Sequence, residues 1–313
     1  MSSTVLVTGA SGFLGRQVFS LFQRSGVLAV GQGFSRAAPP TILKADLEST
    51  EEIKSLIDDV KPQIVIHCAA NRSPDLCEKN PERARKVNVE ATRTLAAECS
   101  SRGAFLIYIS TDYVFPGVEG EAPYEVGSET HPPNLYGELK RDGETAVLEA
   151  TQDTGLGVVL RVPVLYGSAK ENSESAVNCL VDAVMKAQDE NAAVSMDDWA
   201  QRYPTSTEDV ARVCRDIVIK YIKEKDRVKE LPRILQFTSE DRMTKYEICE
   251  TLAKVLGVPL PGMVRNRKGN DPGGVQRPYD THMSTKVLKD LGIDVHTMDF
   301  AAWWRRELGA YKK

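Results

Sequence analysis

A glycine-rich turn, Thr8-Gly9-Ala10-Ser11-Gly12-Phe13-Leu14-Gly15, follows the first apolar run of the chain and opens its first helical segment. At this spacing the first glycine permits a tight bend, the second lets the backbone approach a pyrophosphate, and the third lets the helix pack close to the strand. The N–H groups at the start of the helix are free to bind phosphate oxygens. The alternative is a glycine-rich turn that arises by chance. The apolar strand before the turn and the helix after it favour a dinucleotide-binding fold over that alternative. The predicted contacts are Thr8, Gly9, Ser11, Gly12, Phe13, Leu14 and Gly15.

Short apolar runs alternate with helical segments through the first half of the chain. The runs are rich in Val and Ile and continuously apolar, which is typical of parallel strands buried on both faces. The expected strands cover residues 5–8, 28–31, 64–68, 105–110 and 158–162, and the expected helices cover 13–25, 51–60, 81–101 and 134–149. This alternation predicts an α/β fold of the Rossmann type, with a doubly wound parallel sheet.

The pattern changes after about Gly167. The following segments look amphipathic and helical, at 175–187, 208–222, 245–256 and 284–291, and Thr244 is placed to cap the third of them. A long, basic, glycine-rich loop is expected at 261–274. We therefore expect a dinucleotide-binding domain over 1–167 and a smaller, mostly helical substrate or partner lobe over 168–313, with the chain crossing between them.

The end of the second expected strand bears on the choice of cofactor. Folds specific for NAD place an acidic residue there, about 20 residues after the glycine turn, to bind the ribose. This chain instead has Phe34 and Arg36, and Arg36 could neutralise a 2′-phosphate, which favours NADP(H) over NAD(H). The alternative is a solvated surface arginine. Asp46 and Leu47 could reach the adenine, although a simple helix cap is an equal reading of Asp46.

A tyrosine and a lysine four residues apart, Tyr136 and Lys140, lie on one face of an expected helix. Hydride transfer to a ketone requires a proton donor, and a nearby ammonium lowers the pKa of a phenol toward working pH. Thr111, at the end of the preceding strand, is the hydroxyl expected on the substrate carbonyl, with Ser110 as the alternative. These three residues, Thr111, Tyr136 and Lys140, are the predicted catalytic group.

Several other classes of function find no support in the sequence. The net charge of −4 offers no basic surface for nucleic acid, and no apolar run reaches the roughly 20 residues that span a bilayer. The cysteines form no CxxC pair and the histidines have no ligand spacing, so no metal site is expected. The first residues do not resemble a secretory signal. We therefore expect a cytoplasmic protein with reduced thiols.

Together these motifs resemble the extended short-chain dehydrogenase/reductases, and dTDP-4-dehydrorhamnose reductase in particular, over essentially the whole chain. The resemblance implies cofactor contacts from the residues that follow the fourth strand, from a buried helix asparagine and from the strand beside the nicotinamide. It also implies substrate contacts from the Ser110–Phe115 motif and from a C-terminal Arg-Pro motif. The cofactor residues implied are Cys68, Ala69, Ala70, Asn88, Arg161 and Pro163, together with Tyr136 and Lys140, and the substrate residues are Val114, Phe115 and Arg277.

Stretches that hydride chemistry does not require are more similar to the regulatory beta subunit family of methionine adenosyltransferase. They include Arg72-Ser73-Pro74-Asp75, Glu174-Ser175-Ala176-Val177, Gln201-Arg202-Tyr203-Pro204-Thr205 and Met243-Thr244-Lys245-Tyr246-Glu247. That family binds NADP and associates with the catalytic subunit that makes S-adenosylmethionine. The resemblance therefore implies a regulatory subunit whose partner is that catalytic subunit.

The alternative is an active NADPH-dependent reductase whose partner is a nucleotide-sugar substrate, and an epimerase is a third reading. The C-terminal tail after residue 300 does not closely match the ending of the beta subunits, which contributes to their association. Trp303-Trp304-Arg305-Arg306 either anchors a partner or packs the last helix onto the smaller lobe.

Overall fold

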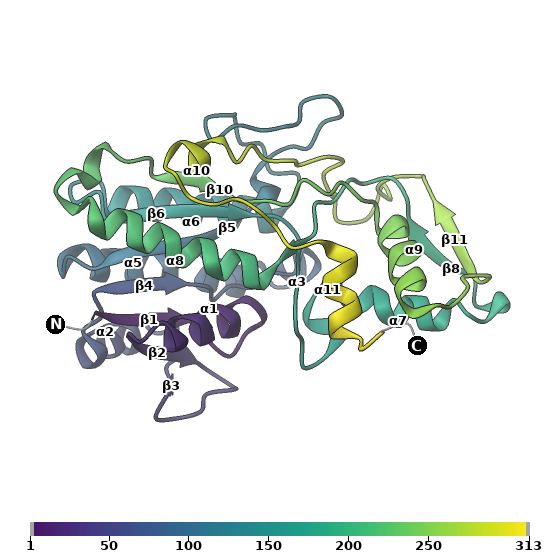
Figure 1. The fold of residues 1–313 in the computed structure, drawn as a ribbon. Coiled ribbons are helices and arrows are strands. Elements are labelled where there is room, and N and C mark those ends of the chain that lie inside the picture. The colour runs from purple at the N-terminus through teal and green to yellow at the C-terminus, as the bar shows by residue number, and fades with distance from the viewer. Residues whose placement is uncertain (1–2, 311–313) are drawn as a thin grey trace.

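The computed structural model describes residues 3–310. Its centre is a seven-stranded parallel sheet in the order β10-β6-β5-β4-β1-β2-β3 (Figure 1). The strands are β1 Thr4–Thr8, β2 Leu28–Gly33, β3 Ile42–Lys44, β4 Ile64–His67, β5 Phe105–Thr111, β6 Gly157–Val162 and β10 Ile234–Gln236. The five expected strands and the parallel sheet are confirmed. The strand order reverses between β1 and β4, the position at which doubly wound sheets bind ligands.

Helices cover both faces of the sheet because its strands are apolar on both sides. Val5 and Val7 of β1 pack into one core with α1 Phe13–Arg24 and α8 Thr207–Lys223. Leu6, between them, packs into the other core with α2 Thr50–Val60 and α5 Ala91–Ser101. Helix α6 Leu135–Ala150 contacts α5 on this second face.

The helix expected over 81–101 is continuous but not uniform. It consists of α4 Pro81–Arg85, a π-helical turn Lys86–Glu90, and α5. Such a turn inserts one extra residue into the helix and is frequent at functional sites. Here it carries Asn88, which is buried.

The smaller lobe has a core of its own. Helices α7 Cys179–Lys186, α9 Lys245–Leu256 and α11 Phe300–Glu307 pack with the parallel pair β8 Val194–Asp197 and β11 Met263–Asn266. Thr244 begins α9 with a complete capping box shared with Glu247, as expected. The prediction of a loop over 261–274 is wrong for its first part, because residues Met263–Asn266 form strand β11, which pairs with β8. The remaining elements are α3 Pro74–Lys79, α10 Lys286–Asp290, β7 Leu165–Tyr166 and β9 Thr205–Ser206.

The last helix packs inward. Trp303 and Trp304 are both buried against Tyr166, and the Trp303 indole N–H donates to Glu208 on α8 at 3.1 Å. Both tryptophans therefore join α11 to the core of the smaller lobe and are not exposed to a partner.

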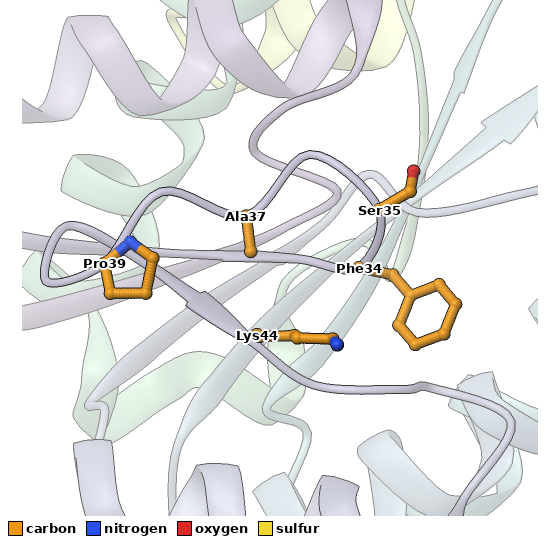
Figure 2. A pocket seen from close by; sticks show the side chains of 5 residues that line it. All are labelled: Phe34, Ser35, Ala37, Pro39 and Lys44. Carbon is orange, nitrogen blue, oxygen red and sulfur yellow. The ribbon is translucent and has the colours of Figure 1, made fainter.

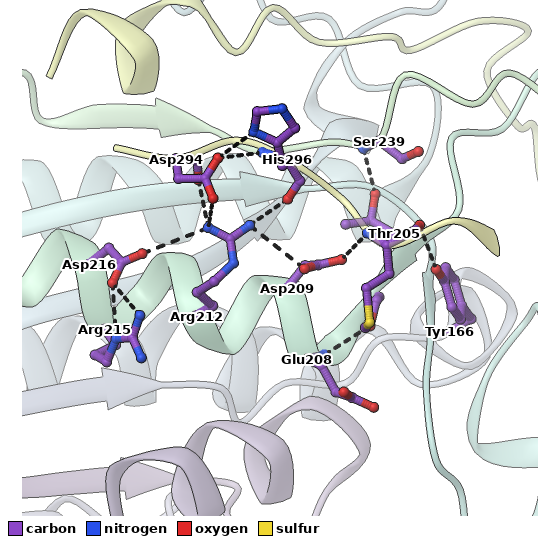
Figure 3. A network of polar contacts seen from close by, with 12 residues as sticks. Tyr166, Thr205, Glu208, Asp209, Arg212, Arg215, Asp216, Ser239, Asp294 and His296 are labelled. Atoms are coloured by element: carbon purple, nitrogen blue, oxygen red, sulfur yellow. Dashed lines mark hydrogen bonds and ion pairs between the residues drawn. The ribbon is translucent and has the colours of Figure 1, made fainter. Parts of the chain in front are cut away.

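The chain returns to the sheet after it has entered the smaller lobe, because α8 and β10 follow α7 and β8 in sequence. Arg212 on α8 ties this part to the segment that leads into α11 (Figure 3). Its guanidinium donates to the carbonyl oxygens of Asp294, at 2.8 Å, and His296, and it is ion-paired with Asp209 and Asp216. The two lobes are therefore joined by several passages of the chain.

Candidate functional site

A cleft of about 920 Å³ lies at the carboxyl ends of the sheet strands and is lined by residues of both lobes. The predicted site residues that line it are Gly9, Ser11, Gly12, Phe13, Leu14, Gly15, Phe34, Arg36, Asp46, Leu47, Cys68, Ala69, Ala70, Thr111, Tyr136, Lys140, Pro163 and Arg277. Those that the structure does not bring to the cleft wall are Thr8, Asn88, Val114, Phe115 and Arg161. One concave site thus gathers most of the residues that the motifs singled out.

The glycine turn begins one end of the cleft. Gly9 has φ +63°, and a Cβ there would lie 2.9 Å from the backbone of Ala69. A Cβ on Gly15 would lie 2.1 Å from Gly9 O. Helix α1 begins at Phe13, and Gly12, which precedes it at the N-cap position, has no side chain that could bond its first N–H groups. The first N–H groups of the helix are therefore left for an anionic ligand.

The buried ring of His67, at the end of β4, is hydrogen-bonded to a hydroxyl of β1 and to a hydroxyl of α5. Thr8 Oγ1 lies 2.7 Å from Nδ1 of His67, and Nε2 of His67 lies 3.0 Å from Thr92 Oγ1. Burial, followed by the charge of Lys140, lowers the pKa of His67 to about 3, so the ring is neutral. Thr8 supports the turn from behind, and sequence reasoning missed its histidine partner.

The end of β2 forms the outer part of the cleft. Phe34 is exposed, and Figure 2 shows its ring beside the ammonium of Lys44, which lies 5.8 Å from the ring centroid. Arg36 is not a free surface arginine, because it donates to Glu174 at 2.7 Å. Asp46 lines the cleft and accepts a hydrogen bond from the N–H of Glu48 at 2.9 Å in the turn before α2. The helix-cap alternative for Asp46 is wrong, because Ser49 is the residue that caps α2.

Asn88 acts on the cleft through another residue. Its amide brackets the backbone of Asn71, accepting from Asn71 N at 2.7 Å and donating to Asn71 O at 2.9 Å. Asn71 and Arg72 line the cleft next to Cys68, Ala69 and Ala70. Asn88 is therefore a positioning residue, and the two lining residues beside it were missed by the sequence reasoning.

The three predicted catalytic residues lie together at the ends of β5 and α6. Asn134 caps α6 by accepting from Gly137 N at 3.0 Å, which sets the face that carries Tyr136 and Lys140. Residue 137 must be glycine, because a Cβ would lie 2.2 Å from Tyr113 O.

The lysine is held deep in the protein. Its ammonium donates to Ile109 O at 2.6 Å and lies 4.0 Å from the centroid of the Tyr108 ring. Burial lowers the pKa of Lys140 to about 7, against a smaller opposing effect of Glu144. Burial also raises the pKa of Tyr136 above its ordinary value, and the neighbouring Thr111 hydroxyl acts in the opposite direction.

The Thr111 hydroxyl is engaged within the protein. It donates to Asp112 Oδ1 at 3.0 Å and accepts from Tyr113 N at 3.2 Å. The alternative hydroxyl, that of Ser110, donates to Glu144 Oε1 at 2.6 Å. Thr111 must therefore release Asp112 before it can donate to a substrate carbonyl.

The part of the cleft formed by the smaller lobe is basic. Arg277 lines it and is ion-paired with Asp75 at 2.8 Å. Arg202 and Lys245 line it as well, and burial lowers the pKa of Lys245. Sequence reasoning missed these last two as site residues, although both lie in stretches that it had singled out for their family resemblance.

The remaining predicted contacts are buried in the protein core. Arg161 forms a bidentate ion pair with Glu144, at 2.9 and 2.7 Å, below the cleft. Val114 and Phe115 are fully buried, and the Phe115 ring stacks on Tyr124. These three predicted contacts therefore do not reach the wall of the cleft.

We expect Lys140→Met to remove a pH-dependent part of the stability. The pKa of Lys140 is about 7 in the folded protein and 10.5 in its ordinary state, so above pH 7 the unfolded chain holds one more proton. The stability of the unsubstituted protein should then rise with pH relative to the variant, by up to about 1.4 kcal/mol per pH unit. Below pH 7 both states hold the proton and the difference should be constant.

Urea denaturation of both proteins between about pH 6 and pH 8.5 measures this difference. The upper limit lies below the ordinary thiol pKa of 9.0, at which cysteines such as Cys68 ionise in the unfolded chain while burial raises the pKa of Cys68 in the folded protein to about 12. Parallel stability curves across this range would contradict the expectation.

Neither a metal centre nor a membrane segment is found in the described chain. Among residues 3–310, no group of three or more His, Cys, Asp or Glu side chains could hold a metal ion. Within the same residues no helix has the length and apolar character to cross a membrane.

Comparisons with known proteins agree with the motifs. Residues 3–310 match the family described as the RmlD substrate binding domain. A Rattus norvegicus protein described as methionine adenosyltransferase 2 subunit beta is 41% identical over 297 residues, which are 95% of this chain and 84% of the rat protein. A dTDP-4-dehydrorhamnose reductase of Streptomyces griseus is 38% identical over 208 residues, which are 66% of this chain and 62% of the reductase.

Solved structures show the same fold. A dTDP-4-dehydrorhamnose reductase from Clostridium acetobutylicum superimposes with a TM-score of 0.80, with 24% identity and 98% of each chain covered. The reductase from Bacillus anthracis, solved in complex with NADP, has a TM-score of 0.80, with 21% identity and 99% of each chain covered. The expected resemblance is confirmed: this chain belongs to the RmlD substrate binding domain family and is similar both to methionine adenosyltransferase 2 beta subunits and to dTDP-4-dehydrorhamnose reductases.

Proposed function

We propose that this chain is the regulatory beta subunit of a methionine adenosyltransferase and that it binds NADP(H) in the cleft between its lobes. The observation that carries the proposal is the 41% identity to the rat beta subunit across 95% of the chain. In this proposal residues 1–167 bind the cofactor, and residues 168–313 complete the cleft and face the partner. The partner is the catalytic subunit that makes S-adenosylmethionine.

The stretches that first suggested this family support the proposal, because several of them reach the cleft. Arg72, Glu174, Arg202 and Lys245 each come from one of these stretches and each line the cleft. The likeness to beta subunits therefore extends to the residues around the ligand site.

The cleft fits a nicotinamide dinucleotide. Gly9 and Gly15 leave a cradle that a Cβ would fill, and the start of α1 is open to phosphate. Arg36 at the end of β2 favours the 2′-phosphate of NADP(H) over the bare ribose of NAD(H).

The six cysteines are free thiols in the structure, which supports a cytoplasmic location for the complex.

Native mass spectrometry tests the proposal. The purified chain is mixed with the methionine adenosyltransferase catalytic subunit of the same organism, with and without NADPH. We expect a hetero-complex of defined mass, followed by an altered rate of the catalytic subunit. The absence of a complex under both conditions would reject the regulatory function.

A second function is favoured by the cluster of Thr111, Tyr136 and Lys140 at the cleft wall. In an NADPH-dependent reductase the bound cofactor would supply hydride to the carbonyl carbon of a keto-deoxy-sugar nucleotide. Tyr136 would give its phenolic proton to the carbonyl oxygen, and Lys140 would stabilise the phenolate that remains. Oxidation of NADPH with dTDP-4-keto-6-deoxyhexoses, lost in Tyr136→Phe, would support this function.

A further inference from the structure

The carboxylate of Glu174 lies between two arginines that belong to the dinucleotide half of the cleft. Arg36, at the end of β2, donates to Oε1 of Glu174 at 2.7 Å. Arg16, in the first turn of α1, donates to both carboxylate oxygens. The backbone N–H of Lys170 donates to Oε2 at 3.0 Å. Glu174 is thus surrounded by hydrogen-bond donors in the way that a bound anion would be. It belongs to the segment that follows β7.

This segment, residues 168–178, connects β7 to α7 and is called the strap below. Two arginines of the dinucleotide-binding half hold the strap. Arg16 on α1 donates to Ser168 O at 3.3 Å, and Arg72, which follows β4, donates to Ser173 O at 3.4 Å. The smaller lobe holds it through Ser168, whose hydroxyl donates to Glu307 on α11 at 2.8 Å. The strap lines the cleft from Ser173 onward, so a ligand in the cleft must lie against it.

The Arg36 guanidinium, which is paired with Glu174, is also the group expected to bind the 2′-phosphate of NADP(H). A phosphate placed on Arg36 would lie close to the Glu174 carboxylate. Two anions held on one guanidinium repel each other, and water screens this repulsion only in part, because the Glu174 side chain is mostly buried although Arg36 is half exposed. A dinucleotide with a bare 2′-hydroxyl places no anion on Arg36 and does not compete with Glu174.

We propose that Glu174 is an internal counter-anion in the seat of the 2′-phosphate, and that it sets the affinity of the cleft for 2′-phosphorylated dinucleotides. To bind, NADP(H) must displace the Glu174 carboxylate from Arg36 and therefore move the strap that carries Glu174. NAD(H) leaves the carboxylate and the strap in place. This inference rests on the proposed binding of NADP(H) and names a residue that limits it.

Protonation does not release the carboxylate under ordinary conditions. The hydrogen bonds from Arg16, and then those from Arg36 and Lys170 N, lower the pKa of Glu174 to about 2. The carboxylate is therefore ionised at every physiological pH. Only a competing anion can take its place on the arginines.

The test measures dissociation constants of NADPH and NADH for the unsubstituted chain and for Glu174→Gln by isothermal titration calorimetry. We expect Glu174→Gln to bind NADPH about tenfold more tightly, which corresponds to about 1.4 kcal/mol. NADH affinity should change less than twofold. In combination with Arg36→Ala, the effect of Glu174→Gln on NADPH should disappear.

Glu171→Gln is the matched control. Glu171 lies in the same strap, and its carboxylate makes no ion pair with any residue of the described chain. This variant should bind both dinucleotides as the unsubstituted chain does.

Hydrogen exchange gives a second readout that does not depend on a variant. In the free protein the backbone N–H of Lys170 donates to the Glu174 carboxylate. This N–H should exchange faster when NADPH is bound, and its exchange rate should not change when NADH is bound. Unchanged or weaker NADPH binding by Glu174→Gln, in a chain that does bind NADPH, would overturn the inference alone. The absence of NADPH binding by both proteins would overturn the inference together with the proposed cofactor.

Discussion

Arg161→Leu should lower the free energy of unfolding by about 3–5 kcal/mol, because it leaves a buried carboxylate without its partner. The side chains of Arg161 and Glu144 are only 3% and 5% exposed. Arg161 donates to both oxygens of Glu144 and also to Gln236 Oε1 at 3.2 Å, so β6, α6 and β10 meet at this pair. Urea denaturation of the variant and the unsubstituted chain measures the loss.

Two further variants, together with the single variant Glu144→Leu, separate the charge from the packing. Arg227→Leu removes one partner of an exposed pair with Glu230, and it should lower the free energy of unfolding far less than Arg161→Leu does, because water screens the pair. The double variant Arg161→Leu, Glu144→Leu removes both buried charges and should recover part of the loss. A double variant as unstable as the sum of its two single variants would show that packing, and not the unpaired charge, is responsible.

Gly15→Ala should weaken NADPH binding by about 10-fold or more, which corresponds to about 1.4 kcal/mol. The reason is that the glycine turn, which is proposed to hold the pyrophosphate, must move to admit a methyl group. The added Cβ would lie 2.1 Å from Gly9 O and 2.7 Å from Gly9 C, and both atoms are backbone. The same displacement should cost about 1–3 kcal/mol of stability, as overpacking does elsewhere. Calorimetric titration with NADPH and thermal denaturation measure the two effects.

Gly127→Ala is the control for this substitution, because a Cβ there meets no atom within 4 Å. It should change neither binding nor stability measurably. If Gly15→Ala bound NADPH as tightly as Gly127→Ala, the glycine turn would not be the seat of the pyrophosphate.

Local patterns in the sequence were enough to predict most of the sheet and half of the cleft. The glycine turn, the apolar strands and the Tyr136/Lys140 spacing each lie within about a dozen residues, and the backbone alone determines how such residues are arranged. The strand order then brings their carboxyl ends to one edge, so a sequence that predicts the strands also predicts where the site lies.

Charged residues were placed less well. Arg161 was expected beside the nicotinamide because it starts a recognised motif. However, the side chain of Arg161, on β6, is ion-paired with Glu144 on α6, because a buried guanidinium requires a carboxylate partner. The partner-anchor reading of Trp303 and Trp304 was wrong for a different reason: both side chains are buried in the core of the smaller lobe, where they pack on Tyr166.

The sequence by itself determined the strands of the Rossmann sheet, the glycine turn and the Tyr136/Lys140 pair, since each is set by residues close in the chain, and the order of strands and helices then placed Thr111 beside that pair. Only the tertiary structure decided which charges meet across the cleft. Glu174 reaches Arg36 from 138 residues away, and Arg277 reaches Asp75 from 202 residues away. Such pairs form because the two lobes fold against each other, and the energy that selects them depends on distance and burial, which no local pattern records.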